Sequence, residues 1–218
     1  MSYPFEDDYR RRRLQVRRYF ALVNSTERTQ SSVKIELDRL HILRAGSFLI
    51  VYNLIEATAR AGLQAIYDDM AAKRVPFHDL NDGIRREIVK GFKRNGNAEK
   101  HCEMADLPVD IVSASLDVEY HFSGNVDARL LKAIAELYGF SILADKARTR
   151  DGADLLTIKT TRNDLAHGDK TYDDVGRDYT ARNLLEIGMR SLAYMEAFIG
   201  AVSEYLKTES YRRPPPPT

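Results

Sequence analysis

Arg162, Asn163 and His167 are the residues whose types and spacing point most directly to chemistry in this chain of 218 residues. Histidine exchanges protons near neutral pH, so it can serve as a general acid or base. Arginine stays charged, and its planar fork of donors matches phosphate oxygens. An arginine and a histidine together therefore suit a reaction at phosphate, in which one moves protons and the other stabilises negative charge.

The element that must position these residues is a predicted helix over about 153–167. Its apolar residues recur three to four apart or at twice that spacing: Leu155, Ile158 and Leu165. Gly168 follows as a helix stop, because glycine readily takes the left-handed conformation after a last turn. Arg162 and His167 are five residues apart and so point about 140° from each other. One helix does not aim both at one atom, whereas a second copy related by a two-fold axis would bring the missing partner.

The segment from Arg162 to Gly168 reads Arg-Asn-Asp-Leu-Ala-His-Gly. It resembles the Arg-x4-6-His signature of the HEPN superfamily (higher eukaryotes and prokaryotes nucleotide-binding domains), and the fuller string Arg-Asn-x-Leu-Ala-His-Gly is more specific than the short signature. Two further stretches, 52–60 and 123–129, resemble stand-alone bacterial HEPN proteins in sequence, order and separation. The resemblance spans about residues 35 to 205.

This resemblance implies an all-helical homodimer with a composite active site and, often, a metal-independent endoribonuclease. Similar proteins are toxins of toxin–antitoxin or phage-defence systems, which implies an RNA substrate and an antitoxin or defence-system partner. Arg162, Asn163 and His167 are then the catalytic candidates: one His167 acts as base and the other as acid, and Asn163 orients His167 or donates to a phosphate. Some HEPN domains only bind nucleotides or RNA, or only mediate dimerisation, so a non-catalytic module is the alternative.

The same residues also have a structural interpretation. In this interpretation Arg162 pairs with a core carboxylate such as Glu56, and His167 caps the helix C-terminus, where a protonated imidazole is favoured. Asp164, between the two, is a supporting candidate. Cleavage that survives His167→Ala would favour the structural interpretation.

A long helix is predicted over about 32–73, with Ser32 as its cap and a wide apolar stripe typical of the central helix of a bundle. A polar line runs along it: Asn53, Glu56, Arg60, Gln64 and Tyr67. Glu56 and Arg60 are four apart, in the favourable order for an ion pair. The line is either a solvent face or faces a dimer cleft near Arg162, which makes Asn53, Glu56 and Arg60 supporting candidates.

A basic helix is predicted before it, over about 6–28. Its arginines are Arg10, Arg11, Arg12, Arg13, Arg17 and Arg18. In one interpretation they pair with the acidic residues at 6–8, and in the other the four consecutive arginines grip RNA phosphates. A helical DNA-binding protein would also use them.

The remaining pattern completes an all-α, HEPN-like bundle. Helices are predicted over 84–93, 126–138 (capped by Asn125 and stopped by Gly139) and 181–206 (capped by Thr180), with an irregular insertion over about 95–124 and a loop over 168–179. We expect one domain over 1–209 and a disordered, proline-rich tail over 210–218.

Composition narrows the class of protein. A net charge of +1 gives no global attraction to nucleic acid, so RNA binding must come from local patches. The single Cys102 excludes an intramolecular disulfide, and no metal-ligand spacing occurs, so we expect neither metal nor cofactor. No apolar signal core and no run of about 18 apolar residues were found, so we expect a cytoplasmic protein without membrane contact.

Overall fold

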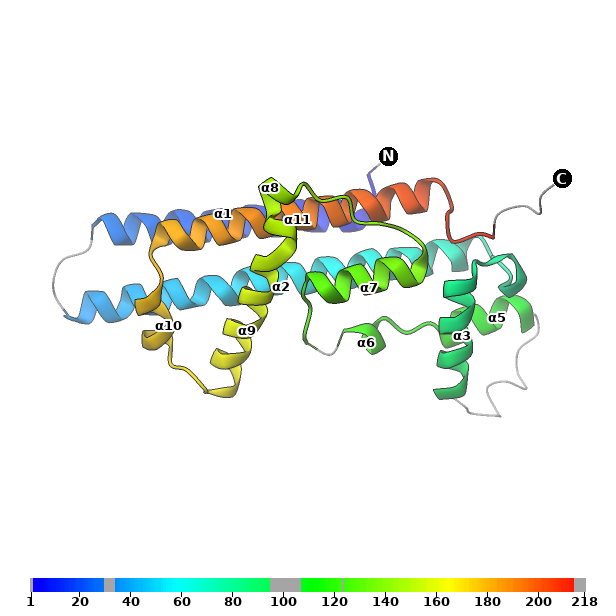
Figure 1. Ribbon diagram of the computed structural model, residues 1–218, viewed down its shortest axis with the longest axis horizontal. Coiled ribbons are helices and arrows are strands. Elements are labelled where there is room, and N and C mark those ends of the chain that lie inside the picture. Colours follow the sequence, from blue (N-terminus) through cyan, green and yellow to red (C-terminus); the bar gives the residue numbers. More distant parts are fainter. Residues whose placement is uncertain (1, 30–33, 95–106, 123, 214–218) are drawn as a thin grey trace.

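The structure, a computed structural model, describes residues 2–29, 34–94, 107–122 and 124–213. Within these ranges the chain is all-α, as predicted, and contains no strand; Leu80 and Arg212 form an isolated antiparallel bridge. The principal helices are α1 (Pro4–Arg28), α2 (Lys34–Ala72), α3 (Asp82–Arg94), α5 (Leu107–Ser115), α6 (Val118–His121), α7 (Ala128–Tyr138), α8 (Lys146–Thr149), α9 (Ala153–His167), α10 (Tyr172–Asp178) and α11 (Ala181–Lys207) (Figure 1).

The long helix α2 is the centre of the bundle, as the wide stripe predicted. α1, α9, α10 and α11 all pack against it. By length and composition, Glu36–Ala72 is apolar enough to cross a membrane, a test that core helices also pass; half of its most apolar window is buried here. The predicted cap Ser32 lies outside the described residues.

α1 and α11 form a layer on one side of α2 (Figure 1). The Tyr9 hydroxyl donates to the Leu192 carbonyl at 2.9 Å, and Gly188 gives the Phe20 ring room: a Cβ there would lie 2.4 Å from it. Thr180 caps α11 as predicted, accepting from the Asn183 N–H. These contacts fix the layer on which α9 begins.

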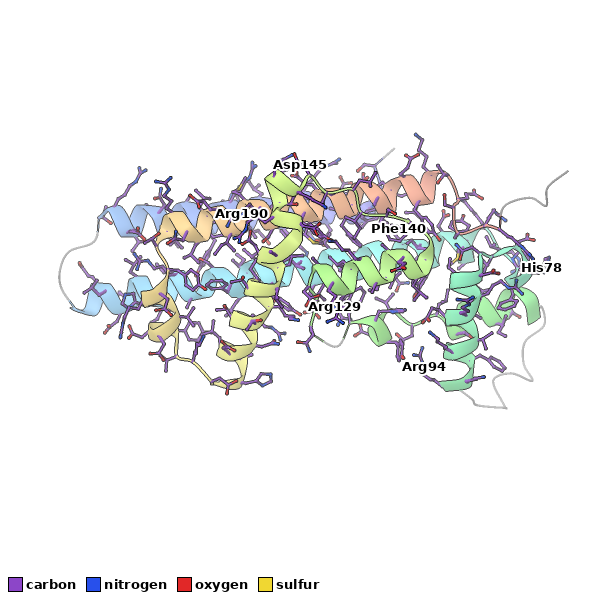
Figure 2. The ribbon with its side chains drawn as sticks, in the orientation of Figure 1. His78, Arg94, Arg129, Phe140, Asp145 and Arg190 are labelled. Carbon is purple, nitrogen blue, oxygen red and sulfur yellow. The ribbon has the colours of Figure 1, made fainter. Side chains whose placement is uncertain are left out.

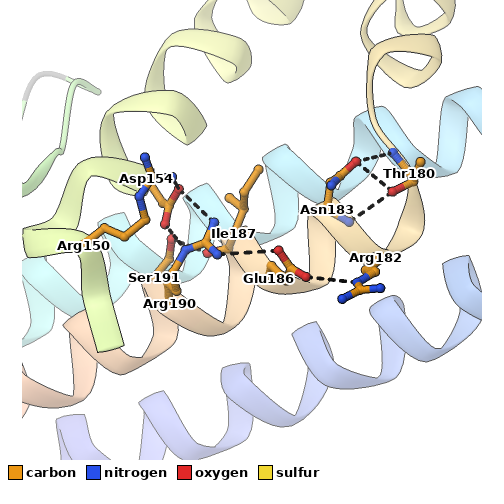
Figure 3. Close-up of polar contacts among 9 residues, drawn as sticks. All are labelled: Arg150, Asp154, Thr180, Arg182, Asn183, Glu186, Ile187, Arg190 and Ser191. Carbon is orange, nitrogen blue, oxygen red and sulfur yellow. Dashed lines mark hydrogen bonds and ion pairs between the residues drawn. The ribbon is translucent and has the colours of Figure 1, made fainter. Parts of the chain in front are cut away.

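The motif helix α9 begins and ends where the sequence predicted. Its first turn is fastened to α11 by Asp154, which is only 2% exposed. The Asp154 carboxylate accepts from Arg190 Nε at 2.5 Å and lies 3.4 Å from Arg150 Nη1 (Figure 3). From there α9 crosses α2, and its last turn extends beyond α2 on the side away from α11 (Figure 1). Gly168 ends it at φ 78°, the left-handed conformation expected of the stop.

Part of the predicted irregular insertion is helical. Residues 107–115 and 118–121 form α5 and α6, although their sequence shows no sustained helical period. Packing supplies the stability: α5 lies so close to α3 that a Cβ at Gly91 would be 1.9 Å from the Ser115 carbonyl oxygen. The stretch 95–106 lies outside the described residues.

Three other boundaries also differ from the predictions. The expected loop over 168–179 contains α10, whose first turn has a reciprocal capping box between Thr171 and Asp174. α7 is capped by Asp127 rather than by Asn125. The expected tail starts too early, because Tyr211 is fully buried and its hydroxyl donates to Asp69 at 2.6 Å. Residues 214–218 lie outside the described chain.

Candidate functional site

Arg162 lies half-buried against α2, where its guanidinium carbon sits 4.4 Å from the centre of the Tyr52 ring. Its Nη1 donates to Asn163 Oδ1 at 2.8 Å and approaches the Gly124 carbonyl oxygen at 3.4 Å. The ion pair with Glu56 that the structural interpretation offered is absent, and Arg162 has no carboxylate partner within the described chain. A guanidinium held only by neutral acceptors and an aromatic face keeps its charge available to an incoming anion.

The loop before α7 closes the site from the other side. Asn163 Nδ2 donates to Asn125 Oδ1 at 2.8 Å, so the asparagine that faces Arg162 is itself held by this loop. Gly124 has φ 79°, a left-handed conformation that favours glycine, and its carbonyl is the one that Arg162 approaches. Asn163 therefore orients Arg162 in this structure, whereas one of the two roles expected from the sequence was to orient His167.

Tyr52 connects Arg162 to the predicted Glu56–Arg60 pair. The Tyr52 hydroxyl accepts from the Val126 N–H at 3.2 Å, and the Glu56 carboxylate contributes to the shift of its pKa. Burial, with a smaller effect of Glu56, raises the pKa of the Tyr52 phenol, which stays neutral at physiological pH. The tyrosine thus acts as an uncharged platform between Arg162 and the acidic group.

Glu56 and Arg60 form the expected ion pair, at 2.9 Å. Arg60 continues outward: it donates to the Phe122 carbonyl at 2.6 Å and pairs with Glu119 at 2.5 Å. The pair therefore holds α6, and the loop that follows it, against α2.

The other members of the polar line have different positions. Asn53 and Gln64 are exposed, and Gln64 donates to Asp68 at 2.7 Å. Tyr67 is buried, and its hydroxyl meets that of Tyr138. Only the middle of the line, Glu56 and Arg60, belongs to the neighbourhood of Arg162.

His167 is exposed at the end of α9 and makes no hydrogen bond or ion pair within the described residues. Asp164 supports the turn that follows it. The Asp164 carbonyl accepts from the N–H groups of Asp169 at 2.9 Å and Lys170 at 3.2 Å, and its carboxylate pairs with the Lys170 ammonium at 3.0 Å. Arg162 faces α2 and His167 faces solvent, so a single chain does not bring the two together, as the helical geometry predicted.

The four consecutive arginines of α1 all have carboxylate partners. Arg10 pairs with Asp7 at 2.7 Å, Arg12 with Asp8 at 2.7 Å, and Arg13 with Glu196 at 2.8 Å. Arg11 also pairs with the Asp8 carboxylate. These contacts match the pairing interpretation, while the binding of RNA by Arg10–Arg13 stays a prediction.

Sequence reasoning did not assign Tyr52, Gly124 and Asn125 to the site. They precede Arg162 by 110, 38 and 37 positions, respectively. The spacing of residues within one helix therefore gives no sign that they contact Arg162 or Asn163. The signal for them was the resemblance of the 52–60 and 123–129 stretches to the same family, because both stretches meet α9 at Arg162 and Asn163.

No group of three or more His, Cys, Asp or Glu side chains suited to a metal occurs in the described part of the chain. His121 lies in a buried contact, with its Nε2 3.2 Å from the Tyr138 hydroxyl, and burial lowers its pKa. Cys102 lies outside the described residues.

Comparison with known proteins identifies the family. The family model described as HEPN_MAE_28990-like HEPN matches residues 1–211, nearly the whole chain. No curated protein and no solved structure gives a significant match. The match includes α2, α9 and the loop before α7, the three segments that meet at Arg162. The chain belongs to the HEPN superfamily, in its MAE_28990-like family.

Proposed function

We propose that this HEPN protein is a metal-independent endoribonuclease that acts as a homodimer. The observation that carries the proposal is the state of Arg162: half-buried, held by Tyr52 and Asn163, and without a carboxylate partner among the described residues. Arginines in such positions are usually neutralised by a carboxylate, and this one is available for a phosphate. HEPN domains are commonly ribonucleases, which agrees with this reading.

The reaction would use two copies of the motif. One His167 takes the proton of the ribose 2′-hydroxyl as the 2′-oxygen attacks phosphorus, and the bond from phosphorus to the 5′-oxygen breaks. The second His167 gives a proton to the leaving 5′-oxygen, which leaves a 2′,3′-cyclic phosphate and a 5′-hydroxyl. Arg162 stabilises the charge that builds on the phosphate, an effect worth several kcal/mol in comparable sites (about 2.7–4).

The dimer is part of the proposal because the His167 side chain has no hydrogen-bond or ion-pair partner among the described residues of one chain and points away from Arg162. A two-fold axis near the end of α9 would bring two exposed imidazoles and two guanidinium groups to one cleft. In a cell, such an enzyme fits a toxin of a toxin–antitoxin or phage-defence system, restrained by a protein partner.

The separation of Arg162 from His167 also favours a second function, a non-catalytic module that binds RNA or nucleotides through Arg162 alone. In that case His167 caps the C-terminus of α9, where a positive charge is favoured. The two functions differ in a single property, the cutting of RNA.

The test is cleavage of a single-stranded RNA in EDTA, beside the same RNA with one 2′-deoxy nucleotide at the mapped cleavage site. The proposal predicts cutting that survives chelation, products with cyclic phosphate ends, and no cutting at the deoxy position. Cleavage that requires added magnesium or manganese, or that continues at the deoxy position, would show that the chemistry is different.

A further inference from the structure

The outer face of α3 is a strongly basic, exposed helix surface. Five of its 13 residues are Lys or Arg, against two acids. Spacings of four, seven and eight residues place four of them on one face: Arg86, Lys90, Lys93 and Arg94. The net charge of the whole chain is only +1, so this helix is the kind of local patch that nucleic-acid binding requires.

Most of this charge is not neutralised. Arg86, Lys93 and Arg94 are exposed and have no carboxylate partner within the described chain. Lys90 pairs with Glu87 at 2.7 Å, and that carboxylate is itself buried. On α1 the four consecutive arginines are all paired, although Arg17 and Arg18 of the same helix have no ion pair among the described residues.

The helix that carries the charge is firmly seated. Ile84 and Ile88 are fully buried on its inner face. At Gly83 a Cβ would lie 1.7 Å from the Leu137 carbonyl oxygen, and at Gly91 a Cβ would lie 1.9 Å from that of Ser115. Close backbone contact on two sides, to α7 and to α5, holds the basic face in a fixed orientation.

Aromatic rings accompany the cations. Tyr120 of α6 is 55% exposed, and the Arg94 guanidinium carbon lies 3.1 Å from its ring centre. At the other end of α3, Arg85 lies 5.0 Å from the Phe77 ring, in a surface hollow of about 530 Å³ also lined by Val89. Cations beside exposed aromatic rings are typical of surfaces that bind single-stranded nucleic acid, whose unpaired bases stack on the rings.

The surface lies on the same side of α2 as the end of α9 (Figure 1). α3 and the last turn of α9 extend from α2 on the same side, with α6 between them, and Arg94 lies at the far end of α3 (Figures 1 and 2). Gly124, whose carbonyl Arg162 approaches, follows Tyr120 by four residues, so their Cα atoms are at most about 14 Å apart. α1 lies on the opposite side of α2 (Figure 1).

We propose that the outer face of α3, together with Tyr120, is the surface that binds the single-stranded RNA flanking the scissile bond. The inference rests on the proposed ribonuclease function and adds the place where the substrate strand lies. Phosphates would contact Arg86, Lys93 and Arg94, and a base would stack at Tyr120. From there the single-stranded RNA would run along α6 to Arg162. In this proposal the RNA lies along α3, whereas the basic face of α1 is the other surface that the sequence offered for RNA.

The experiment measures binding of a short, unstructured, fluorescein-labelled RNA by fluorescence anisotropy over a range of salt concentrations. All proteins carry His167→Ala, so that the RNA stays intact. Arg86→Glu with Lys93→Glu should weaken binding at least about tenfold and reduce the slope of log K against log salt by about 1 to 2, the value for two lost phosphate contacts. Tyr120→Ala should weaken binding by about fivefold or more.

The matched control is Arg17→Glu with Arg18→Glu on α1. These arginines are also exposed and without an ion pair among the described residues, and the change of charge is identical. The control should bind like its parent. The proposal would be overturned if both double variants weakened binding equally, or if the α3 variant did not weaken it. It would also be overturned if the parent did not bind RNA, or if it bound duplex DNA as tightly as the RNA. Binding that depends on α3 without cleavage by the unaltered protein would support the surface while refuting the ribonuclease.

Discussion

Asn163 is the side chain that accepts a hydrogen bond from Arg162 among the described residues. Its Oδ1 accepts from the guanidinium at 2.8 Å, while its Nδ2 is held by Asn125. An amide in this position orients the cation without neutralising it. The side chain next to the arginine in the motif therefore has a role that depends on its being uncharged.

We expect Asn163→Asp to slow RNA cleavage by about 10²-fold or more and to be worse than Asn163→Ala. The aspartate keeps the size and the acceptor but adds a negative charge beside Arg162 and loses the donor to Asn125. Single-turnover rates at one pH compare the variants, and melting curves establish that both fold. If Asn163 had only a packing role, the isosteric aspartate would be the milder substitution.

At the scale of elements, Asp127 joins α7 to the motif helix. Its carboxylate accepts from the Leu130 N–H at 3.0 Å as the cap of α7 and from Lys159 of α9 at 2.5 Å. Burial by itself would raise the pKa of Asp127, but the hydrogen bonds from Lys159 and Leu130 outweigh it, and the pKa is lowered. The folded state therefore favours the charged form of the Asp127 carboxylate.

Because this pKa is lower in the folded state, its stabilising effect is fully present above the unfolded value of about 3.9 and is lost as the pH falls from there through the lower folded pKa. Asp127→Ala should reduce the free energy of unfolding by about 1–2 kcal/mol at pH 7. The difference from the wild type should begin to shrink below about pH 5 and continue to shrink as the pH falls further. Urea titrations across this range measure it, and a difference independent of pH would contradict the assignment.

Helices with strong local signals were predictable from sequence, and those that depend on packing were not. α9 has a glycine stop and α11 has a threonine cap, both have regular apolar spacing, and their predicted ends are correct or within one residue. α5 has no such pattern and is stabilised by its contact with α3 near Gly91. α10 did have a local signal, the capping box of Thr171 and Asp174. The helix is only seven residues long, and its segment was predicted as a loop.

At the scale of the whole molecule, the fold places the two motif residues in different surroundings and gathers the other parts of the site from distant segments. Tyr52, Gly124 and Arg162 belong to α2, the loop before α7 and α9. Sequence spacing predicted the divergence of Arg162 and His167, because that follows from helix geometry alone. It did not predict the position of α3 on the same side as the end of α9, since only the packing of α3 on α5 and α7 determines it.

We expect a symmetric homodimer with the end of α9 at or near the two-fold axis. His167 would then gain, from the second copy, the partners that it lacks in one chain. Light scattering at micromolar concentration should give twice the mass of the chain. A monomer under these conditions would remove the composite site and with it the proposed division of labour between two histidines.

The most direct test of the central claim is the rate at which His167→Ala cuts RNA. Loss of a general acid or base costs about 10²–10⁴ in rate, so cleavage should fall by that factor. Its melting temperature and dimer mass should match the wild type, because the His167 side chain is exposed and makes no hydrogen bond or ion pair within the described residues. A variant that cuts RNA at the wild-type rate but melts at a lower temperature would contradict the account and make His167 a helix cap.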